Sequence, residues 1–94
     1  MRATRVVVVT NPQGLHARPA DLFVKTATRF ASKIELVKGR ERVDGKSILN
    51  LLTLAAVAGT QLLIEADGPD AEQALEALAK LVETDFAEAE RMHE

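Results

Sequence analysis

The sequence predicts an α+β domain of two layers, with the element order β-α-β-β-α-β-α and with the helices on one face of the sheet. Four short segments have the β-branched composition or the two-residue alternation of strands, and three have apolar residues at helical spacing. The two kinds of segment interleave along the chain. The length of 94 residues predicts one domain over residues 1–94, with the tail from about residue 85 extending the last helix or fraying.

The first strand is predicted over residues 4–10. Four consecutive valines there favour β-structure, and their unbroken run indicates a central strand covered on both sides. A helix is predicted to follow the loop at residues 11–14. Pro19 fixes its start, because proline lacks an N–H and is tolerated only in the first turn. The N-cap must therefore lie near Leu15 to Arg18, which places His16 at the beginning of this helix.

Residues 33–37 and 41–43 are predicted to pair as a hairpin around a tight turn. Ser47 is a predicted N-cap for a short helix whose apolar residues recur at helical spacing: Ile48, Leu51, Leu52 and Ala55. A fourth strand is expected over residues 60–66. The last helix is expected to open at residues 67–69, with Pro69 in its first turn and with one apolar stripe: Ala71, Ala74, Leu75, Leu78, Leu81 and Val82.

Composition excludes several classes of function. The net charge is −2 and aromatic residues make up 3%, which argues against a general nucleic-acid-binding surface. Cysteine is absent, so the chain has no disulfide, thiolate nucleophile or cysteine metal site. The two histidines, His16 and His93, are far apart, and no ligand spacing suggests a metal or another cofactor. No apolar run is long enough to cross a membrane, and we expect a cytoplasmic protein.

The start of the first helix combines residue types that suit phosphoryl chemistry. Imidazole is a nucleophile near neutral pH, and a helix N-terminus gathers backbone N–H groups and partial positive charge that favour an anion. Arg18 adds a planar, permanently charged donor two residues after His16, and Gly14 lets the backbone approach a bound group closely. A neutral His16 ring could therefore accept a phosphoryl group. The alternative is that His16 is an ordinary surface or capping residue, which is the commoner role for a lone histidine before a helix.

The segment NPQGLHARPA at residues 11–20 resembles the active-site signature of the HPr family, the histidine-containing phosphocarriers of the bacterial phosphotransferase system. The resemblance covers essentially the whole chain. KSIL at residues 46–49 looks like the family's regulatory-serine segment, and DGPD at residues 67–70 opens the last helix in the expected place. The resemblance implies an open-faced β-sandwich, in which three helices cover one face of a four-stranded antiparallel sheet.

The resemblance also implies the roles of individual residues. His16 would be phosphorylated on Nδ1 by phospho-enzyme I and would pass the group to a sugar-permease A domain or a regulatory equivalent. Arg18 would bind the phosphoryl oxygens, with the backbone amide of Ala17 nearby. Ser47 would be the target of a serine kinase and phosphorylase, although a cap alone also explains a serine at this position. The protein would be a carrier rather than an enzyme, and we expect it to be a monomer.

A docking patch beside His16 is also implied, formed by Ile48, Leu49 and Leu52 and bordered on the outer face of the first helix by Asp21 and Lys25. The alternative is that the leucines only fill the core. Asp21 departs from the small or neutral residues common in the family, and it weakens the positive field near the phosphate.

Two further interpretations stay open. One is a regulatory relative that signals in nitrogen or carbon control, and the other is a small α+β module without phosphoryl chemistry. The tail departs from the family by running past its usual end, and three glutamates make it acidic: Glu88, Glu90 and Glu94. A family role for the terminal carboxylate is therefore not carried over, and His93 is expected to be a solvated residue.

Overall fold

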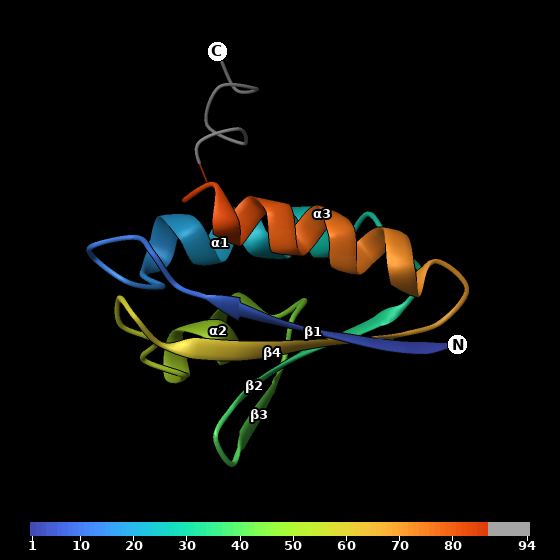
Figure 1. The fold of residues 1–94 in the computed structure, drawn as a ribbon, viewed down its shortest axis with the longest axis horizontal. Coiled ribbons are helices and arrows are strands. Elements are labelled where there is room, and N and C mark those ends of the chain that lie inside the picture. Colours follow the sequence, from blue (N-terminus) through green and yellow to red (C-terminus); the bar gives the residue numbers. More distant parts are fainter. Residues whose placement is uncertain (87–94) are drawn as a thin grey trace.

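The structure, a computed structural model, describes residues 1–86. Figure 1 shows the elements in the predicted order, and their bounds are β1 (Arg2–Val8), α1 (Ala17–Ala27), β2 (Lys33–Lys38), β3 (Glu41–Asp44), α2 (Ile48–Thr53), β4 (Gln61–Asp67) and α3 (Ala71–Glu83). The predicted α+β class and the open-faced sandwich are confirmed. The first helix, α1, begins within the predicted window, directly after His16.

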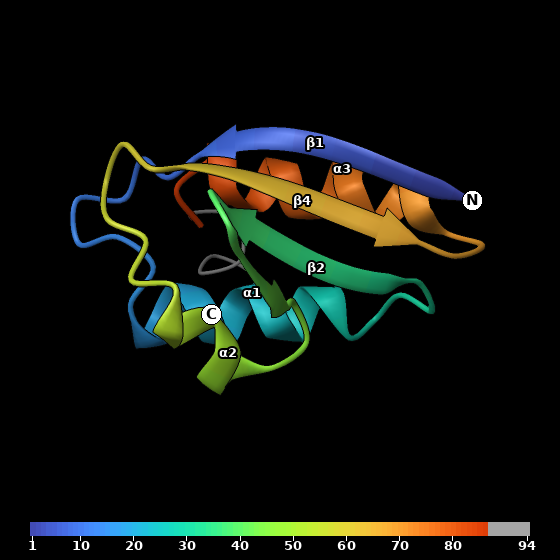
Figure 2. The same cartoon turned by 90° about the horizontal axis from the view of Figure 1, so that it is seen from below.

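The sheet has the strand order β1-β4-β2-β3, and every neighbouring pair is antiparallel (Figure 2). The predicted hairpin is the β2–β3 pair, with Leu36 opposite Val43. The prediction that the first strand is central is wrong, because β1 lies at an edge of the sheet. Its valines alternate in environment: Val7 is buried beneath the helices, whereas Val6 and Val8 are 59% and 39% exposed on the opposite face of the sheet. An unbroken apolar run therefore did not require cover on both sides.

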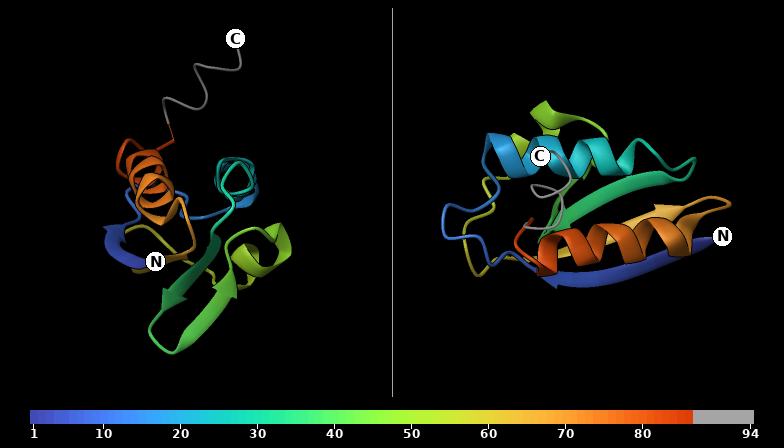
Figure 3. Two further views of the ribbon diagram at one scale, coloured as in Figure 1. Left: turned by 90° about the vertical axis from the view of Figure 1, so that its right-hand side faces the viewer. Right: turned by 90° about the horizontal axis from the view of Figure 1, so that it is seen from above.

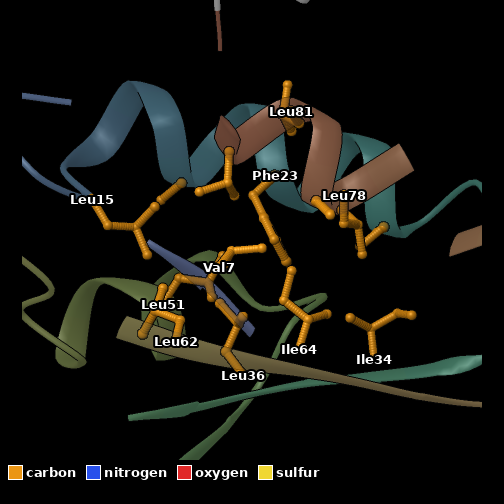
Figure 4. Packing of buried hydrophobic residues seen from close by; sticks show 14 of the residues in the cluster. Val7, Leu15, Phe23, Ile34, Leu36, Leu51, Leu62, Ile64, Leu78 and Leu81 are labelled. Atoms are coloured by element: carbon orange, nitrogen blue, oxygen red, sulfur yellow. The ribbon is translucent and has the colours of Figure 1, made fainter. Parts of the chain in front are cut away.

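The core lies between the sheet and the helices on one of its faces. Figure 3 shows α1 and α3 side by side over that face, and α2 contacts both α1 and β3. Alternate residues of β2 and β4 point inward, as the two-residue period predicts. They meet Phe23 of α1 and Leu78 of α3, both at most 1% exposed (Figure 4). The predicted apolar stripe of α3 is buried throughout.

Two details of the helices differ from the prediction. Pro69 lies outside α3, because the N-cap is Asp70 and the helix begins at Ala71. Ala55 is exposed and has a φ of +48°, so it does not continue the buried face of α2. Leu54, which is 1% exposed, fills the core there instead. The early end of α2 at Thr53 matters for the functional site, because the following residues leave the helix and reach the loop before α1.

An ion-pair network crosses the face of the sheet that the described helices leave uncovered. Arg2 of β1 and Arg42 of β3 both pair with Glu65 of β4, and Arg42 also pairs with Glu35 of β2 at 3.0 Å. These contacts join all strands of the sheet. Hydrogen bonds from Arg2, reinforced by Arg42, hold the pKa of Glu65 below its ordinary value of 4.5 against the opposing effect of burial.

Asp70 joins the loops that precede β2 and α3. Its carboxylate accepts hydrogen bonds from the Ser32 hydroxyl at 2.5 Å, the Ser32 amide at 2.9 Å and the Ala31 amide at 2.9 Å. These bonds hold the pKa of Asp70 below its ordinary value of 3.8, and the bond from the Ser32 hydroxyl has the largest effect. The acidic residue at the start of α3 therefore acts as a cross-link between loops.

We expect the free energy of unfolding to decrease as the pH falls below about 4.5. The pKa values of Glu65 and Asp70 are lower in the folded protein than in the unfolded chain, so the unfolded state binds more protons in this window and acid favours it. The stabilisation is complete above the unfolded pKa values and is lost as the pH falls through the folded ones. Urea unfolding as a function of pH measures this slope. Glu65→Gln should reduce it, whereas Glu76→Gln, an exposed control on α3, should not; equal slopes in the two variants would contradict the role of the network.

Candidate functional site

His16 is the N-cap of α1, within the predicted window. Its backbone is extended (φ −84°, ψ −170°), its side chain makes no capping hydrogen bond, and it is partly exposed. The first helical hydrogen bond runs from the Ala20 amide to the His16 carbonyl at 3.0 Å. Pro19 has no N–H, so the amides of Ala17 and Arg18 are the donors of the first turn. The ring therefore stands next to the positive end of a helix without being used to cap it.

The loop before α1 is shaped by Asn11. The Gln13 amide donates to Asn11 Oδ1 at 3.2 Å, the Gly14 amide donates to the Asn11 carbonyl at 2.8 Å, and Asn11 Nδ2 donates to the Gly14 carbonyl at 3.1 Å. Gly14 has a φ of +73°, a conformation that residues with a side chain rarely adopt. This turn places Leu15 in the core, where it is 6% exposed, and directs the chain into His16.

The acceptor loop, defined here as residues 11–16, rests on the chain that follows α2. The Leu15 amide donates to the Ala56 carbonyl at 2.8 Å. A Cβ on Gly14 would come within 2.5 Å of the same oxygen and 2.9 Å of Val57 Cα, so the two backbones are in close contact. Figures 1 and 2 both show these loops side by side at one end of the molecule. We name residues 54–57 the supporting segment.

Sequence reasoning missed the supporting segment. Its hydrogen bond to the acceptor loop is made by the backbone carbonyl of Ala56, and the amino-acid type of a residue does not show which partner its carbonyl has. The left-handed conformation of Ala55 also leaves no trace, because glycine or asparagine is the usual residue there.

The other predicted site residues of α1 lie along the helix that His16 caps. Ala17 and Arg18 are exposed in its first turn. Asp21 pairs with Lys25 at 3.0 Å, in the i,i+4 geometry that stabilises helices. This ion pair offsets part of the positive charge of Lys25.

Ser47 and the two exposed leucines of α2 have the environments that the sequence predicted. Ser47 is the N-cap, and its hydroxyl accepts a hydrogen bond from the Asn50 amide at 3.3 Å. Leu49 and Leu52 are 72% and 38% exposed, whereas Ile48 is half-buried against the core. The helix that carries them, α2, contacts α1, which begins directly after His16. The two exposed leucines do not fill the core.

Within residues 1–86, no group of three or more histidine or acidic side chains could hold a metal ion, and no helix is long and apolar enough to span a bilayer. The predictions for His93 and for the acidic tail residues fall outside the described part of the chain: Glu88, Glu90 and Glu94.

Comparison with known proteins identifies the family of this chain. The family model described as the phosphorylation site of the PTS HPr component matches residues 3–84. The phosphocarrier protein HPr of Neisseria meningitidis is 42% identical over 84 residues, which are 89% of this chain and 94% of that protein. The HPr-like protein Crh of Bacillus subtilis is 47% identical over 70 residues, which are 74% and 82% of the two chains.

Solved structures agree as well. HPr-C-His from Thermoanaerobacter tengcongensis superimposes with a TM-score of 0.88 at 39% identity, over 90% of this chain and 96% of that one. An HPr dimer from the same organism has a TM-score of 0.73 at 41% identity, over 85% and 92% of the two chains. The chain therefore belongs to the HPr family, the phosphocarrier proteins of the phosphotransferase system.

Proposed function

We propose that His16 accepts a phosphoryl group from phospho-enzyme I and passes it to a sugar-permease A domain. The observation that carries this proposal is the partly exposed imidazole at the N-cap of α1, which makes no capping hydrogen bond. The ring is thus available to a partner and lies beside donors that suit an anion. The protein acts as acceptor and donor in the relay and is not itself an enzyme.

In the proposed transfer, the Nδ1 lone pair of the His16 ring attacks phosphorus while the bond between phosphorus and the ring nitrogen of the phosphohistidine of enzyme I breaks. The donor ring keeps the electron pair of the broken bond, and the phosphoryl group moves intact. Arg18 and the Ala17 amide donate to its oxygens, which compensates the charge spread over them in the transition state. In the second transfer, phosphorylated His16 is the donor and the sugar-permease A domain is the acceptor.

This function is tested by incubating the protein with enzyme I and phosphoenolpyruvate. We expect one phosphate per chain that is lost in acid and retained in alkali, and a phosphorus–nitrogen coupling at Nδ1 in the NMR spectrum. The absence of enzyme I-dependent label, or a label stable in acid, would overturn the proposal. Addition of a permease A domain should then remove the label from the wild-type chain.

We propose that partners dock on Ile48, Leu49 and Leu52, with Asp21 and Lys25 at the rim. An apolar centre with a charged border suits a transient contact. The proposed carrier is a cytoplasmic protein of one domain, and it binds neither nucleic acid nor a membrane. It acts as a monomer, because each transfer must expose His16 to a new partner.

Leu49→Ser should raise the KM of enzyme I for this protein about tenfold, because an exposed leucine that becomes buried on docking contributes about 1.5 kcal/mol or more. Val6→Ser is the matched control, since Val6 is also exposed but lies on the uncovered face of the sheet. Steady-state phosphorylation kinetics compare the two variants. An equal KM in both would place the docking surface elsewhere.

A second candidate function is regulatory, and it is favoured by the similarity to Crh together with the position of Ser47 at the N-cap of α2. A phosphate on Ser47 would add negative charge beside Leu49 and would repel acidic partner surfaces. Capture of partners from a lysate distinguishes the functions: a permease A domain supports transport, whereas a transcription regulator, or a serine kinase and phosphorylase acting on Ser47, supports regulation.

A further inference from the structure

Lys38 makes a contact that the phosphocarrier function does not explain by itself. It is the last residue of β2, and its side chain lies on the inner face of the sheet in the same alternation as Ile34 and Leu36. Its partly buried ammonium donates to the Leu54 carbonyl at 2.8 Å. Leu54 is the C-cap of α2, where a positive charge interacts favourably with the helix dipole.

The bonded carbonyl lies where the chain turns from α2 toward the acceptor loop. The next residue, Ala55, has a φ of +48°, which is unfavourable for a residue with a Cβ and persists only where the surroundings hold it. The residue after that, Ala56, offers its carbonyl to the Leu15 amide at 2.8 Å. Lys38 therefore anchors the supporting segment two residues before it contacts the acceptor loop.

We propose that Lys38 is a positioning residue for phosphoryl transfer. By holding the Leu54 carbonyl, it keeps the supporting segment in place, and this segment fixes the angle at which Leu15 leads into His16. The inference rests on the proposed function of His16. Lys38 touches no reacting atom, and it acts through the backbone of the supporting segment, the Leu15 amide and the first turn of α1.

A second lysine provides a matched control for the loss of a partly buried hydrogen bond between lysine and a backbone carbonyl. Lys46 is also partly buried, and its Nζ donates to the Phe30 carbonyl at 2.7 Å, between segments 16 residues apart. The Lys38 bond spans the same separation of 16 residues. The Lys46 bond holds the end of the α1 region that is remote from His16, because Phe30 follows the C-terminus of α1. Loss of either bond removes a comparable interaction, but only one of them supports the acceptor loop.

The test compares Lys38→Met, Lys46→Met and Lys38→Arg. Native-state hydrogen exchange should show the Leu15 amide exchanging about tenfold faster in Lys38→Met, the factor expected for loss of one charge-assisted hydrogen bond. Lys46→Met should leave that rate at the wild-type value, and Lys38→Arg, which retains a cationic donor, should restore it. Lys38→Gln replaces the methionine variant if that variant does not fold.

Transfer kinetics provide the second measurement. With enzyme I, the turnover of Lys38→Met should fall about tenfold at an unchanged KM, because the acceptor is misplaced while the docking surface is intact. An unchanged Leu15 exchange rate, an equal increase in Lys46→Met, or an effect on KM alone would overturn the role of Lys38. If the wild-type chain accepts no phosphate, the proposed function fails, and the exchange measurement still decides whether Lys38 holds the acceptor loop.

Discussion

Replacement of His16 by alanine should abolish phosphoryl acceptance while the fold stays intact. The imidazole makes no capping hydrogen bond and is partly exposed, so its removal should change the free energy of unfolding by no more than about 0.5 kcal/mol. The only nucleophile proposed at this site is lost, so enzyme I-dependent label should fall to background. Urea unfolding and phosphorylation assays on the same preparation separate the two quantities.

Ser47→Ala gives the opposite pattern and serves as the control for His16→Ala. The Ser47 hydroxyl caps α2, so its removal should cost about 1 kcal/mol of stability. The variant should still accept the acid-labile phosphate, because the acceptor ring is unchanged. Acid-labile label on His16→Ala at the wild-type rate would show that another residue is the acceptor.

Replacement of Gly14 by alanine should lower the free energy of unfolding by about 2–3 kcal/mol. The φ of +73° is unfavourable for alanine, and the new Cβ would meet the Ala56 oxygen at 2.5 Å and Val57 Cα at 2.9 Å. Both are backbone atoms, so a side-chain rotation cannot relieve the contact, and the acceptor loop must separate from the supporting segment. The smaller entropy of the unfolded chain offsets less than about 1 kcal/mol of this cost.

Gly39→Ala isolates the backbone part of the effect. Its φ of +59° is also positive, but a Cβ at this position would meet no atom beyond the two neighbouring residues within 4 Å. This variant should lose only about 1 kcal/mol, with normal phosphorylation. Gly14→Ala should in addition accelerate exchange of the Leu15 amide. If the two variants are equally stable and phosphorylated at equal rates, the close packing at Gly14 does not constrain the site.

Sequence alone predicted the position of His16 at the start of α1, for a specific physical reason. Pro19 can stand only in the first turn of a helix, and this restricted the N-cap to a few residues around His16. Ser47 was located by the same kind of local rule for caps. The inward positions of β4 followed from alternation, since Leu62, Ile64 and Ala66 are all buried.

The rest depended on contacts between segments that are distant in the sequence. A run of valines does not predict that Val6 and Val8 face solvent, because the position of β1 at the edge of the sheet depends on the strand order. The Lys38–Leu54 bond and the close approach at Gly14 involve backbone carbonyls, which every residue carries. Local patterns therefore predicted the helix caps and the inward positions of β4, but not the contacts between distant segments that hold the acceptor loop.

The strand order also has a consequence for how the protein acquires its structure. The ion pair between Arg2 and Glu65 joins residues separated by 63 positions, and β1 pairs with β4 as its neighbour in the sheet. The first strand to be synthesised, β1, must therefore wait for the last strand of the sheet, β4, before it can form its hydrogen-bond ladder. Such long-range pairing slows folding and leaves the valines of β1 open to association in the interval. We expect a nascent or truncated chain that ends before β4 to be the form of this protein most prone to aggregate.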